Sequence, residues 1–221
     1  MALSRLYFVT MDRVPGVTDG AVMAPLGQVE AACRAGIRLI QLRMKEASDE
    51  EFLMTARDAM KICRAWGSRL IINDRVAVAA AVDADGVHVG QEDLPVREAR
   101  RMLGKGKIVG GTANTMGDIR EHYKGGADYI GLGPYRYTTT KKKLSPILGL
   151  EGYSKVVRQM DAEGISVPIY AIGGIGVEDV GGLVGAGVYG VAFSGMLVRA
   201  ADRARMVTEL LKQFRYVEDS R

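Results

Sequence analysis

The sequence is poor in the residues that build metal clusters, disulfide frameworks and base-stacking surfaces. Its 221 residues include two cysteines and two histidines, and aromatic residues make up only 6% of the chain. Two cysteines cannot form a disulfide scaffold or a four-cysteine zinc site. Cys33 and Cys63 lie among apolar neighbours in helical patterns, so we expect reduced core thiols in a cytoplasmic protein. The scarcity of aromatics argues against a nucleic-acid partner.

Long apolar runs are also missing. No apolar stretch approaches the roughly 20 residues that span a bilayer, so we expect no membrane association. Residues 1–5 lead directly into a strand-like segment, which predicts that no signal peptide opens the chain. The net charge of +4 is modest and is compatible with an anionic small ligand.

Short apolar runs alternate with helical patterns along the chain. We expect strands at 6–10, 38–43, 69–73, 86–89, 107–110, 128–132, 167–172 and 188–193. We expect helices at 23–35, 48–66, near 80, and at 96–103, 116–124, 150–162, 177–184 and 200–214. A long polar loop covers 133–149. Eight βα units in one domain, 1–221, predict a (β/α)8 barrel, the TIM-barrel fold, and a doubly wound open sheet is the alternative.

The most informative stretch is the end of the second expected strand. An apolar run at 36–40 is followed by Gln41, Arg43 and Lys45, which share one face because side chains alternate along a strand. Two cations and an amide at the exit of a buried strand suit a phosphate-bearing ligand.

Other polar residues follow the expected strands in the same way. Barrels bind ligands where strands end, so these residues are predicted to meet in one mouth. They are Asn73, Asp74, Asp93, Thr112, Thr138, Thr140, Lys141, Gly174, Ser194 and Gly195.

Two groups within this set have a specific chemistry. Asp74 and Asp93 emerge from neighbouring loops, and carboxylate oxygens beside phosphate oxygens suit Mg²⁺. Gly174 and the amides of Ser194 and Gly195 are similar to the phosphate cradle after strands seven and eight of many barrels. Two anion sites in one mouth predict two phosphorylated substrates, or one substrate with phosphates at both ends.

Each residue also has a local explanation that remains open at this point. Asp74 and Asp93 could each cap a helix, and the polar segment 138–143 could be a solvated loop. His88 is expected to be a core histidine, and His122 is expected to lie on the surface.

Eight motifs together give the chain a family resemblance. They are LYFVT at 6–10, QLRMK at 41–45, IINDR at 71–75, GVHVGQEDLP at 86–95, VGGTANT at 109–115, GLGPYRYTTTKK at 131–142, PIYAIGGI at 168–175 and GVYGVAFSG at 187–195. In this order they resemble the thiamine-phosphate synthase family over nearly the whole chain.

The resemblance implies a Mg²⁺-dependent barrel transferase. Hydroxymethylpyrimidine diphosphate loses diphosphate, and a hydroxyethylthiazole phosphate attacks through its ring nitrogen, by a dissociative, carbocation-like route. It implies that Asp74 and Asp93 bind Mg²⁺ and that Arg43, Lys45 and Lys141 act on the diphosphate. The remaining implied contacts are Gln41, Asn73 and Thr112 for the pyrimidine diphosphate and Thr138, Thr140, Gly174, Ser194 and Gly195 for the thiazole phosphate.

Two positions depart from the family pattern. Thr112 stands where serine is frequent, so the hydroxyl is kept and a methyl group is added. Ser194-Gly195 stands where an aliphatic residue and serine are common, so the backbone amides remain and a hydroxyl at 195 is lost.

Three other functions compete with the synthase. The related thiazole tautomerase carries a histidine two positions after the strand-five hydroxyl residue, where this chain has Asn114. A non-catalytic phosphate-ligand binder would not need Asp74 and Asp93 together with Lys141. A phosphosugar isomerase or lyase needs a general base, which either aspartate could supply. The sequence leaves open whether the chain forms a homo-oligomer.

Overall fold

The computed structural model describes residues 3–12, 23–137 and 146–219, with side chains as far as residue 215. Its strands match the eight expected runs in number and order. They are β1 (Leu6–Val9), β2 (Leu39–Leu42), β3 (Arg69–Asn73), β4 (Gly86–Val89), β5 (Ile108–Ala113), β6 (Tyr129–Leu132), β7 (Ile169–Ala171) and β8 (Gly190–Phe193).

Helices follow the strands along the chain. They are α1 (Pro25–Arg34), α2 (Asp49–Ala65), α3 (Val76–Ala81), α4 (Val96–Leu103), α5 (Met116–Lys124), α6 (Gly149–Ala162), α7 (Val180–Gly185), α8 (Gly195–Arg199) and α9 (Arg203–Asp219), with a 3₁₀ turn, η1 (Val177–Asp179), before α7.

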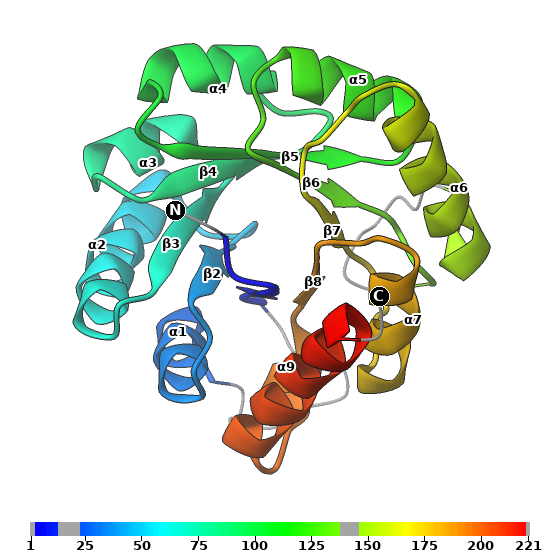
Figure 1. The fold of residues 1–221 in the computed structure, drawn as a ribbon. Coiled ribbons are helices and arrows are strands. Elements are labelled where there is room, and N and C mark those ends of the chain that lie inside the picture. The colour runs from blue at the N-terminus through cyan, green and yellow to red at the C-terminus, as the bar shows by residue number, and fades with distance from the viewer. Residues whose placement is uncertain (1–2, 13–22, 138–145, 220–221) are drawn as a thin grey trace.

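The strands form a closed parallel barrel in sequence order, because β1 pairs with both β2 and β8. Parallel neighbours need crossover connections, and the helices that provide them surround the barrel (Figure 1). The (β/α)8 prediction is therefore confirmed, and the open doubly wound sheet is excluded. The register aligns Val9 with Gln41, Asn73 with His88 and Thr112 with Gly131.

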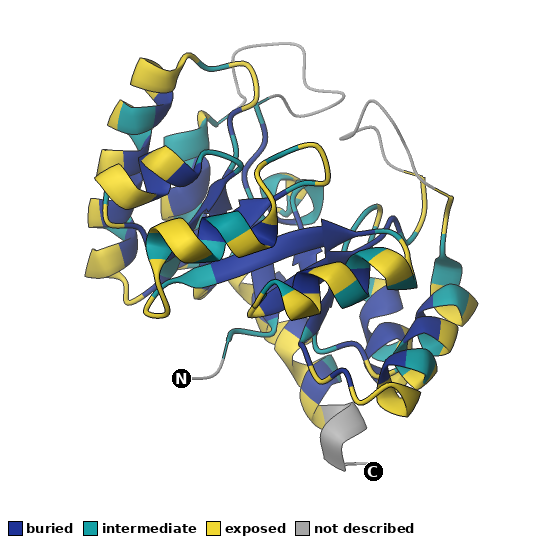
Figure 2. Cartoon of the chain, turned by 90° about the horizontal axis from the view of Figure 1, so that it is seen from above, coloured by how far each residue is buried: buried dark blue, intermediate teal, exposed yellow. Residues whose placement is uncertain are grey.

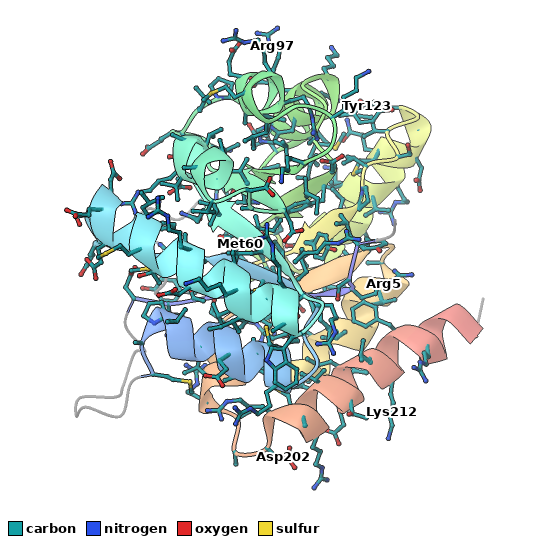
Figure 3. The ribbon with its side chains drawn as sticks, turned by 90° about the vertical axis from the view of Figure 1, so that its left-hand side faces the viewer. Arg5, Met60, Arg97, Tyr123, Asp202 and Lys212 are labelled. Carbon is teal, nitrogen blue, oxygen red and sulfur yellow. The ribbon has the colours of Figure 1, made fainter. Side chains whose placement is uncertain are left out.

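Two apolar layers hold the barrel together. The larger one lies between the strands and the helices, whose outward faces are exposed (Figure 2). Met60 of α2 is buried in this layer, whereas Arg97 of α4 and Tyr123 of α5 are exposed at the periphery (Figure 3). Burial of this apolar surface is the main favourable contribution to folding.

The second layer fills the barrel interior. The rings of Tyr7, Tyr129 and Tyr170 pack edge to face, with centroids 5.3–5.5 Å apart. A side chain at Gly110 would overlap the Tyr129 ring, and one at Gly190 would overlap the Tyr170 ring. Because the interior is packed, a ligand is restricted to the ends of the strands.

Three helix boundaries differ from the expectations. The first helix begins at Pro25 rather than at residue 23, since proline fits the first helical turn. The segment expected as one helix at 177–184 is a 3₁₀ turn followed by α7. Helix α8, which the sequence analysis did not predict, precedes a last helix that runs from Arg203 to Asp219 instead of 200–214. Five residues are too few to show a helical period.

The cysteine and histidine expectations have mixed outcomes. Cys33 and Cys63 are buried free thiols, as expected. His88 is buried inside the barrel, as expected. His122 is also buried, and its Nε2 lies 2.8 Å from the carbonyl oxygen of Thr112, so the surface prediction is wrong. The reason is its spacing from Ile119, because residues three apart share a helix face, and that face of α5 packs on the barrel.

No helix in the described ranges is both long and apolar enough to cross a membrane.

Candidate active site

The exit of β2 is anchored by hydrogen bonds to the end of β1. Gln41 is buried inside the barrel, and its Nε2 donates to the Tyr7 hydroxyl at 2.6 Å. The backbone N–H of Arg43 donates to Thr10 Oγ1 at 2.8 Å, and the Thr10 hydroxyl donates back to the Arg43 carbonyl at 3.0 Å. The Arg43 guanidinium lies 3.5 Å from Asp12 Oδ2. Arg43 is thus held at the strand end with most of its side chain covered.

Lys45 and Asp74 meet across the β2 and β3 loops. The Lys45 ammonium pairs with Oδ2 of Asp74, and the Lys45 backbone N–H donates to Asp12 at 3.1 Å. Asp74 adopts a left-handed backbone conformation with φ of 60°, which is uncommon outside glycine. Its N–H donates to the His88 carbonyl at 2.8 Å, which ties this turn to β4.

Asp93 lies against Asp74. Its Oδ2 accepts a hydrogen bond from the Gly90 N–H at 2.7 Å. Burial raises the pKa of Asp93 above its ordinary value, and a hydrogen bond with the Asp74 carboxyl raises it further. The Lys45 ammonium beside the pair lowers the pKa of Asp93 and offsets part of this effect.

The same pair fits a divalent cation. Within the described part of the chain, no three His, Cys, Asp or Glu side chains are grouped so that they could hold a metal ion. Mg²⁺ needs only one or two protein carboxylates when substrate phosphates and water complete its octahedron. Asp74 and Asp93 therefore have the right chemistry for Mg²⁺ and the wrong chemistry for a structural zinc ion.

Asn73 and Thr112 lie near this cluster on strands β3 and β5. Asn73 is buried at the last residue of β3, aligned with His88 of β4. Thr112 is buried too, and its Oγ1 lies 2.9 Å from His88 Nε2. His88 thus contacts Thr112 through its ring and Asp74 through its backbone.

The loops after β7 and β8 carry the second group of predicted residues. Gly174 has φ of +71°, and a Cβ there would lie 2.8 Å from the Tyr137 carbonyl oxygen, so only glycine fits without strain. Ser194 follows β8, and its carbonyl accepts the Leu197 N–H at 3.1 Å at the start of α8. A Cβ on Gly195 would fall 2.6 Å from Nη1 of Arg199.

Three predicted residues, Thr138, Thr140 and Lys141, lie outside the described residues. Their assignment stays a prediction from the sequence.

The sequence analysis missed several residues that contact the predicted site. Arg75 hydrogen-bonds to the loop that carries Lys45, and Arg199 places its guanidinium group beside Gly195. The side-chain stem of Arg136 lies beside Gly174, and its guanidinium donates to Asp179 at 2.6 Å. Arg75 stands inside the motif at 71–75, directly after Asp74, which was the available signal. The sequence predicts Tyr7 and Tyr129 only as strand residues, whereas in the structure the Tyr7 hydroxyl contacts Gln41 and the Tyr129 hydroxyl contacts His88.

Comparisons with known proteins agree on one family. The family model described as thiamine monophosphate synthase matches residues 6–197. A curated thiamine-phosphate synthase of Bacteroides fragilis is 47% identical over 84% of this chain and 91% of its own length. That of Phocaeicola vulgatus is 50% identical over 77% of this chain and 82% of its own length.

A solved structure supports the same assignment. The thiamine phosphate pyrophosphorylase of Pyrococcus furiosus superposes with a TM-score of 0.79 at 30% identity, covering 96% of each chain. The family model covers most of this chain, and the barrel and its strand-end residues fit it, so the chain belongs to the thiamine monophosphate synthase family.

Proposed function

We propose that this protein joins hydroxymethylpyrimidine diphosphate to hydroxyethylthiazole phosphate, giving thiamine phosphate and diphosphate. Curated relatives named thiamine-phosphate synthase support the activity over most of the chain. The observation that carries the proposal at the site is the cluster of Lys45, Asp74 and Asp93, a cation beside two carboxylates at the strand ends.

In this proposal the diphosphate binds beside that cluster. Arg43, Lys45 and Lys141 offset its negative charge, and Asp74 and Asp93 hold Mg²⁺. The bound metal supplies charge neutralisation and a template for the phosphate oxygens. Gln41, Asn73 and Thr112 contact the pyrimidine end of the same substrate.

The reaction breaks one bond and forms one bond. The C–O bond to the diphosphate breaks, and its electron pair leaves with the oxygen, where Arg43, Lys45 and Lys141 stabilise the charge. The lone pair of the thiazole nitrogen then forms the new C–N bond at the pyrimidine methylene carbon. That nitrogen carries no proton, so no general base is required, and the chain contributes positioning and electrostatic stabilisation.

The thiazole phosphate is proposed to bind at the loops after β6, β7 and β8. Thr138, Thr140, Gly174, Ser194 and Gly195 are its proposed contacts. The positive φ of Gly174 and the closeness of Arg199 to Gly195 support an anion site there.

The thiazole tautomerase alternative lacks support at the corresponding residue. Asn114 donates its side-chain N–H to the carbonyl of Gly133, and a carboxamide does not titrate as a base.

The decisive experiment mixes both substrates with Mg²⁺ and detects thiamine phosphate by mass spectrometry. Product should require both substrates and the metal. The Asp93→Asn variant should lose most turnover, whereas Asp58→Asn, an exposed carboxylate paired with Lys61, should keep it. Conversion of the thiazole alone, or binding of both substrates without product, would contradict the proposal.

We also propose that the chain works as one domain, 1–221, in the cytoplasm. Sedimentation measurements determine whether it forms a homo-oligomer.

A further inference from the structure

Five side chains form a continuous hydrogen-bonded path across the barrel interior. Gln41 Nε2 lies 2.6 Å from the Tyr7 hydroxyl, which lies 2.7 Å from the Tyr129 hydroxyl. The Tyr129 hydroxyl lies 3.0 Å from His88 Nδ1, and His88 Nε2 lies 2.9 Å from Thr112 Oγ1. The path joins five strands, and both of its ends are proposed to contact the pyrimidine diphosphate.

Stability does not explain this path. All five residues are buried, and Leu39 and Ile71 show that aliphatic side chains also occupy this interior layer. Buried polar groups contribute little net stability compared with apolar side chains of similar volume. A fully satisfied polar path does impose one orientation on each of its members.

The direction of the hydrogen bonds follows from counting protons. The Gln41 amide nitrogen can only donate, so the Tyr7 hydroxyl accepts there and donates its own proton to Tyr129. Tyr129 in turn donates to His88 Nδ1. A neutral imidazole that accepts at Nδ1 carries its proton on Nε2, which donates to Thr112.

The opposite direction is less consistent with the contacts of Tyr7. If Tyr129 donated to Tyr7 while Gln41 also donated, the Tyr7 proton would need a third partner, and the described residues provide none. Burial raises the pKa of both phenols well above the ordinary value, so each keeps its single proton at neutral pH.

We propose that this path is a positioning device that holds His88 as the neutral Nε2–H tautomer, so that Thr112 directs its hydroxyl proton to an acceptor atom of the substrate. His88, Tyr7 and Tyr129 act through Thr112 and do not touch the substrate. The inference rests on the proposed function for the identity of that substrate, the pyrimidine diphosphate. The path thereby makes the site selective for a substrate that has a hydrogen-bond acceptor atom facing the Thr112 hydroxyl.

The tautomer can be measured without any activity. The chain has two histidines, so a spectrum of protein labelled with ¹⁵N in its imidazoles contains two sets of ring signals. A His122→Gln variant assigns them. At neutral pH we expect His88 to show the Nε2–H tautomer. The Nδ1–H tautomer would mean that the path runs in reverse, and a charged imidazolium would also overturn the proposal.

Variants test the link to substrate. Tyr129→Phe removes the hydroxyl that fixes His88, and the KM for the pyrimidine diphosphate should rise roughly tenfold, with the KM for the thiazole phosphate unchanged. Tyr170→Phe is the matched control, because this buried phenol donates outside the path, to the Ser4 carbonyl. Its kinetics should equal those of the wild type.

Thr112 variants complete the test. Thr112→Ser should preserve pyrimidine affinity, and Thr112→Val should lose it by a similar factor as Tyr129→Phe. Equal changes in both KM values for Tyr129→Phe and Tyr170→Phe would indicate a purely structural role and overturn the inference. If no product forms at all, the tautomer measurement still decides the hydrogen-bond direction separately from the proposed function.

Discussion

Arg75 donates a hydrogen bond from Nη2 to the carbonyl oxygen of Ala47 at 2.7 Å. Its Nη1 also reaches the Met44 carbonyl, at 3.4 Å. Met44 directly precedes Lys45, and Arg75 directly follows Asp74. The Arg75 guanidinium therefore ties the loop after β2, which carries Lys45, to the turn after β3, which carries Asp74. The Lys45–Asp74 pair thus depends on a neighbour that has no predicted contact with substrate.

We expect Arg75→Ala to lower kcat/KM for the pyrimidine diphosphate by roughly 10- to 100-fold, the usual effect of losing an outer partner of a metal site. Arg75→Lys should not restore it, since an ammonium cannot make the forked contacts or stack on Phe52, 4.4 Å from the guanidinium carbon. Arg101→Ala, at an exposed arginine paired with Glu98, should leave the kinetics unchanged. Full activity of Arg75→Ala would contradict this role.

The raised pKa of Asp93 predicts a pH dependence of stability in metal-free buffer. Because the pKa is higher in the folded than in the unfolded protein, the folded state binds more protons between the two values. The free energy of unfolding should therefore fall as the pH rises from about 3.9 through the raised pKa. Asp93→Asn should remove this fall. Urea titrations at several pH values measure the effect, and identical pH profiles for the two proteins would refute it.

Mg²⁺ should offset the repulsion between the neighbouring carboxylates of Asp74 and Asp93. A cation bound between the two carboxylates compensates their negative charge, so Mg²⁺ should raise the Tm of the wild type and of Asp58→Asn, but not of Asp93→Asn. The shift should shrink as the pH falls and Asp93 becomes protonated. Thermal scans with and without Mg²⁺ check this, and an equal shift in all three proteins would place the metal elsewhere.

His122 is expected to matter for stability. His122→Ala leaves the carbonyl of Thr112 without this donor and opens space under β5, so the free energy of unfolding should fall by roughly 1–3 kcal/mol. Tyr123→Ala, on the exposed side of the same helix, should change it by less than about 0.5 kcal/mol. Chemical denaturation compares the two, and similar losses would contradict the burial of His122.

Gly174→Ala should weaken thiazole-phosphate binding selectively. The new Cβ would be strained at φ of +71° and would press on the Tyr137 carbonyl. We expect a raised KM for the thiazole phosphate with little change for the pyrimidine diphosphate. Gly106→Ala is the control, since its Cβ would meet nothing within 4 Å. A change confined to the pyrimidine KM would move the thiazole site away from this loop.

Lys141→Ala tests the proposed contact between this lysine and the diphosphate. Its charge is predicted to meet the departing diphosphate, so turnover should fall more than thiazole-phosphate affinity. Steady-state kinetics with each substrate varied in turn separate the two effects. Unchanged turnover with weaker thiazole affinity would reassign Lys141 to the thiazole phosphate.

Much of the fold was predictable because its signals are local. Each apolar run, such as Leu70–Ile72 within β3, is short and bounded by polar or glycine residues, and the helical spacing of α2 is regular. Helix α8 escaped prediction because its five residues are too few to show a helical period. His122 was misassigned because the sequence does not show which face of α5 meets the barrel.

The candidate site was predictable in composition but not in geometry. Arg43, Lys45, Asp74 and Asp93 follow from their places after apolar runs. Three features join segments that are distant in sequence: the contact of the Asp93 carboxyl with Asp74, the Arg75 hydrogen bonds to the β2 loop, and the path through His88.

The sequence thus determined the order of strands and helices, the residue types at the strand ends and the family motifs. These features depend on neighbouring residues and on apolar residues that repeat every two positions in strands or every 3.6 in helices. Closure of the barrel decided which polar groups meet, where burial raises a carboxyl pKa, and which glycines leave room for interior tyrosines. Closure brings β1 against β8 and turns eight separate strand ends into one rim, where charge and hydrogen bonding depend on distances that no local pattern encodes.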